Sequence, residues 1–416
     1  MYKLARLFFA AFVVIFCFYS SQVFAGEVDI LVKKLVEKGI LTNGEAQQIL
    51  TETKEEVRKE IAKGTYSSLP SWLQNIKLKG DMRVRYQWED KTSAEDQHRG
   101  RIRFRLGAEA KVNDKLKVFA GLATGGDDPR STNQTLNNTF DTGDIRLDYA
   151  MGEWAAAPWA TFRAGKLMGI KDQIMRPTDL LWDSDINPEG ASILFNKQVW
   201  DNVGLFMNNG VWILDESSGE ENDPYMVVVQ PGFKVGLGDL GFIGSPTLKM
   251  ATAWYAIANE RGITLDWSAR TNSLDANGDL LYNYDAVSPS LQLDIDNPLG
   301  AVVPYASISV EGIHNPDPND DNNGWAAGIK FGDKKIADFG NWQLAYVYKR
   351  LERDAWLDTF PDSDAYSGGT NIKGHEAILS YGIGKNTSID IDWYTMERIK
   401  GNGRRNVFQV DWNLKF

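Results

Sequence analysis

The sequence predicts an all-β membrane protein, a closed antiparallel β-barrel of about 16 transmembrane strands preceded by a short helical segment. Three observations support this fold class. From Ile76 onward, apolar and polar residues alternate over runs of about 10–13 residues, long enough for a tilted strand to cross a bilayer. Trp and Tyr recur near the ends of these runs, and the connections between them alternate between short and long.

The first run shows the alternation clearly. One parity holds Ile76, Leu78, Met82, Val84, Tyr86 and Trp88, and the other holds Lys77, Lys79, Asp81, Arg83, Arg85 and Gln87. In lipid every backbone N–H and C=O must be paired within the protein, and a closed barrel achieves this without free edges. A soluble β-sandwich shows the same alternation, but its strands are usually shorter and long structureless loops are uncommon in it.

Sixteen runs can be placed along the chain. An even number is typical of single-chain bacterial barrels, and the count is fixed to within about two strands. Barrels of about 16–18 strands leave an aqueous channel rather than a filled interior. The predicted strands are 76–88, 99–112, 116–125, 144–153, 159–167, 189–196, 201–212, 223–235, 246–257, 282–294, 303–314, 323–332, 341–352, 371–383, 387–398 and 404–416.

Residues 1–25 have the features of a secretory signal peptide. Lys3 and Arg6 precede an apolar stretch, residues 7–18, and Ala25 ends a small-residue cleavage site. The alternative, an uncleaved membrane anchor, is disfavoured because the apolar stretch is short for a membrane span. Cleavage would remove Cys17, the one cysteine of the sequence, so we expect no disulfide and no cysteine metal site in the exported chain.

The charge of the chain excludes one class of partner. The formal net charge is −11, and loss of the two basic residues of the signal peptide changes it to −13. An acidic chain with 14 Trp and no basic tail is a poor binder of nucleic acid, so we expect none.

Residues 26–64 predict two helices. Gly39 is placed to end the first helix, and Thr42 with Glu45 forms a capping box for a second helix that runs towards Lys63. This segment is either an oligomerising coiled coil or a helical pair that packs against its own chain, because its apolar seam is too short to decide. Residues 65–75 are expected to be a linker.

The exported chain resembles Gram-negative outer-membrane porins. The resemblance rests on the signal peptide, the helical segment, the sixteen-strand pattern and the final strand FQVDWNLKF, residues 408–416. More narrowly, the chain is similar to the putative-porin group with a helical or coiled-coil N-terminus, which is distantly similar to phosphate-selective porins. The resemblance implies a homotrimer in the outer membrane, in contact with membrane lipid and lipopolysaccharide, with the N-terminal segment in the periplasm.

The resemblance also gives the final strand a role. Its apolar parity ends in Trp412, Leu414 and Phe416. In porins such an end is the recognition signal for the barrel-assembly machinery, and the last strand closes on the first. The function implied is a water-filled channel for passive diffusion of small polar solutes or ions.

The resemblance places a constriction loop at residues 168–188, folded into the lumen. Carboxylates on this loop, facing guanidinium groups on the wall, would create a transverse field in a narrow pore. The alternative is that the arginines only pair with carboxylates and hold the barrel rigid. The predicted pore-lining residues are Arg83, Arg85, Arg101, Arg103, Arg105, Arg146, Arg163, Lys171, Asp172, Arg176, Asp179, Asp183 and Asp185.

The sign of the ion selectivity is less constrained. The arginines favour anions, whereas the net charge favours cations. Many of the acidic residues belong to the loops 317–321 and 354–364, where exposure to salt is expected to screen them. The sequence therefore indicates a weak preference for anions.

Other motifs are weaker. Asp275 to Asp279 resembles the start of a calcium loop but lacks the distal Glu, so an exposed turn is favoured. Asp390 and Asp392 form a pair that fits channel lining better than acid–base catalysis. His98, His314 and His375 have no metal-ligand spacing. We expect no enzyme activity, metal or cofactor; a barrel hydrolase or a structural envelope tether are the alternatives to the porin.

Overall fold

The computed structural model describes residues 32, 34–36, 38, 41–62, 75–216, 222–300 and 302–416. The predicted signal peptide and residues 65–74 of the predicted linker lie outside the described residues. The chain divides into two units, Met1–Gln74 and Asn75–Phe416. No helix in the described ranges combines the length and the apolar character needed to cross a membrane.

The first unit contains helix α3, Asn43–Ala62, which ends one residue before the predicted Lys63. The predicted capping box is present. The backbone N–H and the hydroxyl of Thr42 both donate to Glu45 Oε2, at 2.9 and 2.7 Å, and the Glu45 N–H donates to Thr42 Oγ1 at 3.3 Å. These bonds satisfy N–H groups that have no partner within the first turn of a helix.

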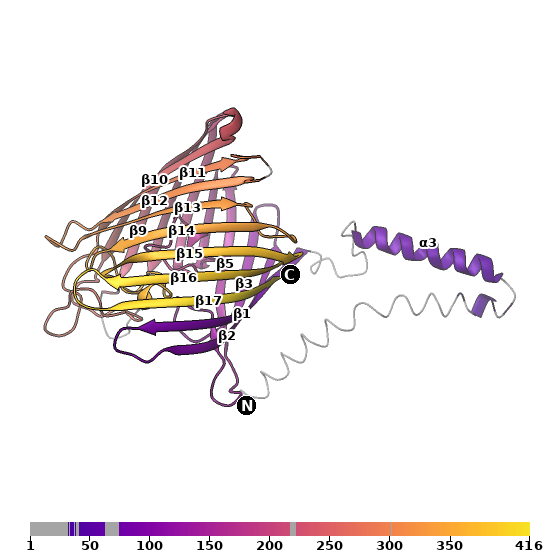
Figure 1. Cartoon of the computed structure of the whole chain (residues 1–416). Coiled ribbons are helices and arrows are strands. Elements are labelled where there is room, and N and C mark those ends of the chain that lie inside the picture. The colour runs from indigo at the N-terminus through magenta and orange to yellow at the C-terminus, as the bar shows by residue number, and fades with distance from the viewer. Residues whose placement is uncertain are drawn as a thin grey trace. The chain divides into compact units, whose positions relative to one another are not determined.

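The second unit is a β-barrel, and the predicted fold class is confirmed (Figure 1). Each of the sixteen predicted ranges overlaps one long strand. The sixteen long strands within the described part of the barrel are β1 Ile76–Lys91, β2 Gln97–Lys111, β3 Leu116–Thr124, β5 Ile145–Ala157, β6 Ala160–Lys166, β7 Glu189–Trp200, β8 Val203–Ile213, β9 Tyr225–Gly236, β10 Ser245–Ala258, β11 Ala286–Asp296, β12 Tyr305–His314, β13 Asn323–Gly332, β14 Trp342–Leu351, β15 Ile372–Gly384, β16 Thr387–Arg398 and β17 Arg404–Lys415.

The barrel closes where the last strand meets the first. Strand β17 pairs antiparallel with β1, with Trp412 opposite Val84 and Leu414 opposite Met82 (Figure 1). Gly80 makes this seam possible, because a Cβ there would lie 2.4 Å from the ring of Phe416. Strand β4, Gln134–Thr135, pairs with β2 and was not predicted, since two residues show no alternation.

The apolar parity of the strands faces outward, as predicted. Leu78, Val118, Trp254 and Ile329 are all exposed on the described barrel, as residues that meet hydrocarbon must be. The opposite parity faces the lumen and carries most of the charged residues of β1 and β2. One face of each strand is therefore suited to contact lipid, and the opposite face is suited to contact water.

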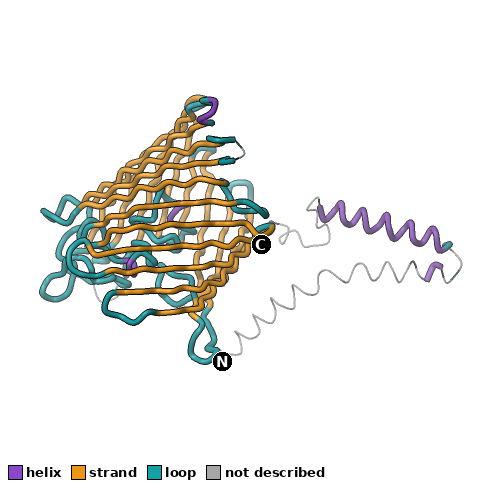
Figure 2. Tube along the Cα trace, viewed as in Figure 1, coloured by secondary structure: helices purple, strands orange, loops and turns teal. Residues whose placement is uncertain are grey.

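The connections alternate in length as predicted. Residues 158–159, 201–202 and 385–386 are tight turns, whereas residues 125–144, 167–188, 259–285 and 352–371 form the long loops. The tube in Figure 2 shows most of the long teal loops at the end of the barrel opposite the C-terminus. Short 3-10 turns, η2 (Ile170–Asp172) and η4 (Tyr366–Gly368), lie in two of these loops, and η3 (Gly241–Ile243) lies in the shorter β9–β10 connection.

The prediction of an unfilled interior is wrong for one side of the lumen. Loops 167–188 and 352–371 fold inward and bury Trp182 and Trp356 against Trp212 of β8 and Tyr255 of β10. We call these four residues and the buried apolar residues that contact them the apolar cluster. Such large rings gain free energy by leaving water, about 1.5–3 kcal/mol for a buried large apolar side chain, so the loops pack instead of extending into solvent.

Candidate functional site

The lumen contains a polar cavity of about 220 Å³. Its walls come from strands β1, β2, β15 and β16 and from loops 125–144, 167–188 and 352–371. Charges of both signs surround it, and we call it the constriction cavity. The residues that line it are Arg83, Arg85, Arg103, Arg130, Asn133, Asp179, Asp183, Ser184, Asp185, Asp362, Ser363, Asp364, Glu376, Asp392 and Tyr394.

The basic wall of the cavity follows from the register of β1 and β2. Arg83 lies opposite Arg103, and Arg85 lies opposite Arg101. Like charges directly across a strand pair repel each other, so the wall needs acidic partners. Arg85 has one in Asp411 of β17, to which its Nε and Nη2 donate at 2.7 and 2.8 Å. This two-point contact holds the guanidinium plane in place.

Loop 167–188 brings a carboxylate onto this wall. Asp185 accepts hydrogen bonds from the backbone N–H and the hydroxyl of Thr132, at 3.1 and 2.9 Å, and lies 3.4 Å from Arg105 Nη1. Arg105 and Arg103 both donate to Asp81 of β1 at 2.8 Å. The loop is therefore attached to the wall through charge-assisted hydrogen bonds.

Loop 352–371 also enters the cavity, which the sequence analysis missed. Asp364 Oδ2 accepts from Arg85 Nη1 at 3.0 Å. The backbone N–H of Ser363 donates to Asp183 Oδ2 at 2.8 Å, and the Asp183 N–H donates to the carbonyl of Phe360 at 2.7 Å. The two inward loops therefore hold each other in position.

Lys349 of β14 joins both loops to the wall. Its ammonium group lies 2.7 Å from Asp179 of loop 167–188, 3.1 Å from Asp362 of loop 352–371 and 2.7 Å from Glu376 of β15. The oxygens of these three acids are close enough together to bind a metal ion. The Lys349 ammonium, whose side chain is only 1% exposed, already supplies the cation there, so the residues do not fit a metal.

Burial and neighbouring charges shift the pKa values of the loop carboxyls in both directions. Burial, with Asp185 and Asp362 nearby, raises the pKa of Asp183 well above its usual value. Burial also raises the pKa of Asp362 to about 6, against the effect of Lys349. Burial opposes ionisation of Asp364 as well, but Arg85, Gln409, Arg101 and Arg405 together outweigh it and lower its pKa. The loop carboxyls at the cavity therefore titrate at different pH values.

The structure brings only part of the predicted set together. Arg83, Arg85, Arg103, Asp179, Asp183 and Asp185 line the constriction cavity. Arg105 lies beside it, and Arg101 contacts Gln87 and Ser131 at 3.4 Å. Carboxylate partners, as the alternative of structural ion pairs expects, are present for Arg83, Arg85, Arg103, Arg105 and Arg163.

The remaining predicted residues lie elsewhere. Arg146 donates to backbone carbonyls of loop 125–144, and Arg163 donates to Glu153 and to the carbonyl of Asp172. Lys171 and the Asp172 side chain are exposed. Arg176 donates to the carbonyl of Trp182 at 2.5 Å, within its own loop. None of these five is part of the cavity lining.

The expectation that the acids of residues 354–364 are exposed is wrong. Asp354 and Asp358 are each 2% exposed. Asp358 accepts from the hydroxyl of Ser268 at 2.7 Å and from the backbone N–H of Asn272 at 3.0 Å. These bonds fix loop 259–285 to loop 352–371, because a buried carboxylate requires hydrogen-bond donors.

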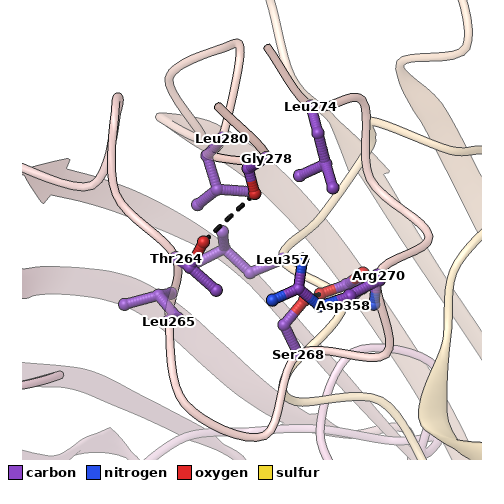
Figure 3. Close-up of a pocket in the computed structure, with 9 residues that line it drawn as sticks. All are labelled: Thr264, Leu265, Ser268, Arg270, Leu274, Gly278, Leu280, Leu357 and Asp358. Carbon is purple, nitrogen blue, oxygen red and sulfur yellow. Dashed lines mark hydrogen bonds between the residues drawn. The ribbon is translucent and has the colours of Figure 1, made fainter. Parts of the chain in front are cut away.

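Figure 3 shows the small space between these two loops. Leu265, Leu280 and Leu357 line it, and the hydroxyl of Thr264 donates to the carbonyl of Gly278 at 3.1 Å. The enclosed volume is about 10 Å³, close to the space of a single water. It is a packing defect between loops and offers no room for a solute.

The weaker sequence candidates have structural roles. Asp275 Oδ1 accepts the backbone N–H groups of Asn277 and Asp279, which makes the segment a tight turn. The three histidines lie on β2, β12 and β15, and each has its own partner: His98 Nδ1 bonds to Tyr86, His314 Nδ1 to Asn323 and His375 Nδ1 to Tyr346. This separation gives no support to the hydrolase alternative.

Asp392 lines the constriction cavity, and Asp390 accepts from Asn413 at 2.7 Å. The residues that the sequence analysis missed are Arg130, Asn133, Asp362, Asp364, Glu376, Lys349 and Tyr394. One signal was present: residues 354–366 mix buried-type apolar residues with closely spaced acids, an unusual composition for an exposed loop.

A closed barrel with an apolar outer face and a charged cavity in its lumen defines an outer-membrane channel protein. A family model described as "Putative porin" matches residues 89–293 and 282–416. The chain therefore belongs to this family, and it is a porin of the outer membrane. No curated protein matches it.

Several solved structures are similar in fold. The Salmonella typhi OmpF complex with daunomycin is 14% identical, with a TM-score of 0.47, over 82% of this chain and 97% of that chain. A loop L8 deletion mutant of OmpT, an outer membrane protein of Vibrio cholerae, is 11% identical with a TM-score of 0.47, over 82% and 100%. A mutant of Rhodopseudomonas blastica porin is 10% identical with a TM-score of 0.44, over 82% and 100%.

Proposed function

We propose that this porin is a passive diffusion channel for small hydrophilic solutes and ions, with a weak preference for anions. The constriction cavity supports this proposal best, because it places charged groups of both signs in a narrow polar space within the lumen. Polar lumen residues of barrels set selectivity, and walls of low dielectric constant strengthen their field.

The expected pH dependence of the selectivity follows from how the two sides of the cavity ionise. Guanidinium groups stay protonated at all physiological pH values. On the acidic side, the pKa of Asp362 is raised to about 6 and that of Asp183 is raised well above its usual value. Part of the acidic side is therefore neutral near pH 6, whereas the arginines keep their charge. We expect the preference for anions to strengthen as the pH falls.

The test is the current of the purified protein in a planar bilayer under a KCl gradient. Stepwise conductance is the expected result, with a reversal potential on the anion side. Arg83→Gln removes a guanidinium from the cavity and should shift the reversal potential towards cations. Arg404→Gln is the matched control, because Arg404 lies outside the cavity lining with its side chain 62% exposed. A folded, heat-modifiable barrel without conductance would refute the channel proposal.

The assembly of the porin is part of the proposal. We propose a homotrimer in contact with lipopolysaccharide, with residues 26–64 in the periplasm and with Trp412, Leu414 and Phe416 as the signal read by the barrel-assembly machinery. The outward position of the Trp412 and Phe416 rings at the seam supports this role, since both side chains are exposed. Conductance in threefold steps would support the trimer. Deletion of Phe416 should lower the amount of folded protein in the outer membrane.

A further inference from the structure

We propose that the constriction cavity is a binding site for a small zwitterionic solute of the α-amino acid class. Its carboxylate would bind at Arg83 and Arg130, and its ammonium group would bind at Asp392. This inference deepens the proposed diffusion function, on which it rests, by naming the solute class.

On the basic side, two arginines keep a free donor. The Nη2 of Arg83 donates to Asn133 at 2.6 Å, and its Nη1 lies 3.5 Å from Asp411 Oδ2. The Nε of Arg130 donates to Asp128 at 3.2 Å. Within the described part of the chain, Arg83 Nε and Arg130 Nη1 are buried atoms without a hydrogen-bond partner. A buried donor without an acceptor is unfavourable, and a carboxylate offers acceptor oxygens for two donors.

The acidic side of the cavity has an acceptor without a donor. Asp392 lies on the lumen parity of β16, and its Oδ1 is buried without a partner among the residues described here. Glu376 and Tyr394 line the cavity next to it, but Glu376 is already bound to Lys349. The free acceptor is therefore Asp392, and an ammonium group carries the N–H donors that match it.

The size of the cavity fits a small solute. One water needs about 10–15 Å³ of such a cavity, and about 220 Å³ is present. A simple anion would satisfy the arginine donors and leave Asp392 unpaired, and a simple cation would do the reverse. A neutral polyol would reach both sides without charge-assisted bonds, which are about twice as strong as neutral ones. A zwitterion satisfies both sides at once.

The first test is block of the KCl current by L-alanine in single channels. Glycerol serves as the neutral probe, and sodium acetate and methylammonium chloride serve as the probes of one sign. We expect L-alanine to block at a concentration at least about tenfold lower than the other three, since one hydrogen bond to a charged group corresponds to about tenfold in affinity. Equal block by alanine and acetate would show that the cavity recognises only the carboxylate group, and it would overturn the inference.

Two variants locate the site. Asp392→Asn and Arg83→Gln should each raise the half-blocking concentration of L-alanine about tenfold. Asp390→Asn is the matched control, because Asp390 lies two residues away on the same strand and outside the cavity lining, and it should leave the ratio of alanine to glycerol block unchanged. Block that is the same in all four proteins would place alanine elsewhere in the lumen.

Calorimetric titration of L-alanine into the folded, detergent-solubilised barrel provides a readout that does not need conduction. Heat of binding in the native protein that is lost in Asp392→Asn would support the site even in a preparation without current. No binding in a channel that conducts KCl would overturn the zwitterion site and leave the diffusion channel standing. The two proposals therefore fail in different ways.

Discussion

The two sides of the lumen differ in the side chains that point inward: one side is apolar and packed, and the other is charged and leaves a cavity. Strands β8 to β13 turn Trp212, Tyr255 and other apolar residues inward, and loops cover them to form the apolar cluster. Strands β1, β2, β15 and β16 turn arginines and acids inward and leave a polar cavity of about 220 Å³ between them and the loops. One side is packed like a protein core, whereas the other is a polar passage.

The two sides are linked through the loops. In loop 167–188 Trp182 belongs to the apolar cluster, and its neighbour Asp183 lines the constriction cavity. In loop 352–371 Phe360 stacks on Trp182 with ring centres 4.6 Å apart, and Asp362 and Asp364 follow it into the cavity. The apolar cluster therefore positions the carboxylates, because a packed ring cannot move without moving the acid beside it.

The largest expected effect is that of Lys349→Met. It removes the cation that three carboxylates share and leaves them buried without compensation, which typically costs about 3–5 kcal/mol. We expect both loops to leave the lumen, with faster proteolysis of residues 352–371 and a larger single-channel conductance. Lys373→Met is the matched control, because the Lys373–Glu397 pair is partly exposed and contributes little. Unchanged proteolysis in Lys349→Met would show that the apolar cluster alone holds the loops.

Trp182→Ala tests the apolar cluster. Loss of this ring should destabilise the packing of loop 167–188 by about 3 kcal/mol, the lower end for Trp→Ala, because Phe360 and Trp356 can close part of the gap. The expected result is a noisier and larger current from a barrel that still migrates as a folded species. Trp254→Ala, which removes a ring that is 55% exposed on the outer face, should leave the current unchanged. Equal currents in both variants would mean that the apolar cluster does not position the loop.

A change of pH sharpens the comparison, because only the charged side titrates. The pKa of Asp362 is raised to about 6, where it faces Asp179, Asp364 and Lys349, and the pKa of Asp183 is raised beside Asp185 and Asp362. A raised acid pKa stabilises the folded loops fully below about pH 4 and loses this contribution as the pH rises through about 6.

The measurement is amide hydrogen exchange in residues 360–364 at pH 5 and pH 8. We expect the protection factors there to fall about tenfold at pH 8, and the fall should disappear in Asp362→Asn. The lowered pKa of Asp364 has the opposite sign and acts only below about pH 4, outside this window. Protection factors that increase with pH would contradict the raised pKa of Asp362.

The smallest expected effect is that of Arg101→Gln. Arg101 lies beside the cavity, not in its lining, with contacts of 3.4 Å to Gln87 and Ser131. We expect a shift of the reversal potential in the same direction as for Arg83→Gln but smaller, without a change in loop proteolysis. A larger shift than for Arg83→Gln would show that ion selectivity is determined nearer the long loops than the constriction cavity.

The strands were predictable and the loop packing was not, for one physical reason. A strand between lipid and water must alternate at every second residue, so runs such as 76–88 and 404–416 identify both the element and its faces. Loops 167–188 and 352–371 have no period. Their contacts, such as Trp182 with Phe360, join residues far apart in the chain. Only the fold brings such residues together, and for the same reason the sequence did not distinguish Arg83 in the cavity from Arg163 outside it.

The bond between Arg85 and Asp411 also bears on how the barrel closes. The two residues are 326 positions apart, and they belong to the first and last strands. If β17 slipped by two residues, Arg85 would face Gln409 or Asn413 and lose its carboxylate partner. If it slipped by one, its charged residues would face lipid. The charges that line the cavity thus also select the register of the final strand, so a barrel closed out of register would lack both its seam and its passage.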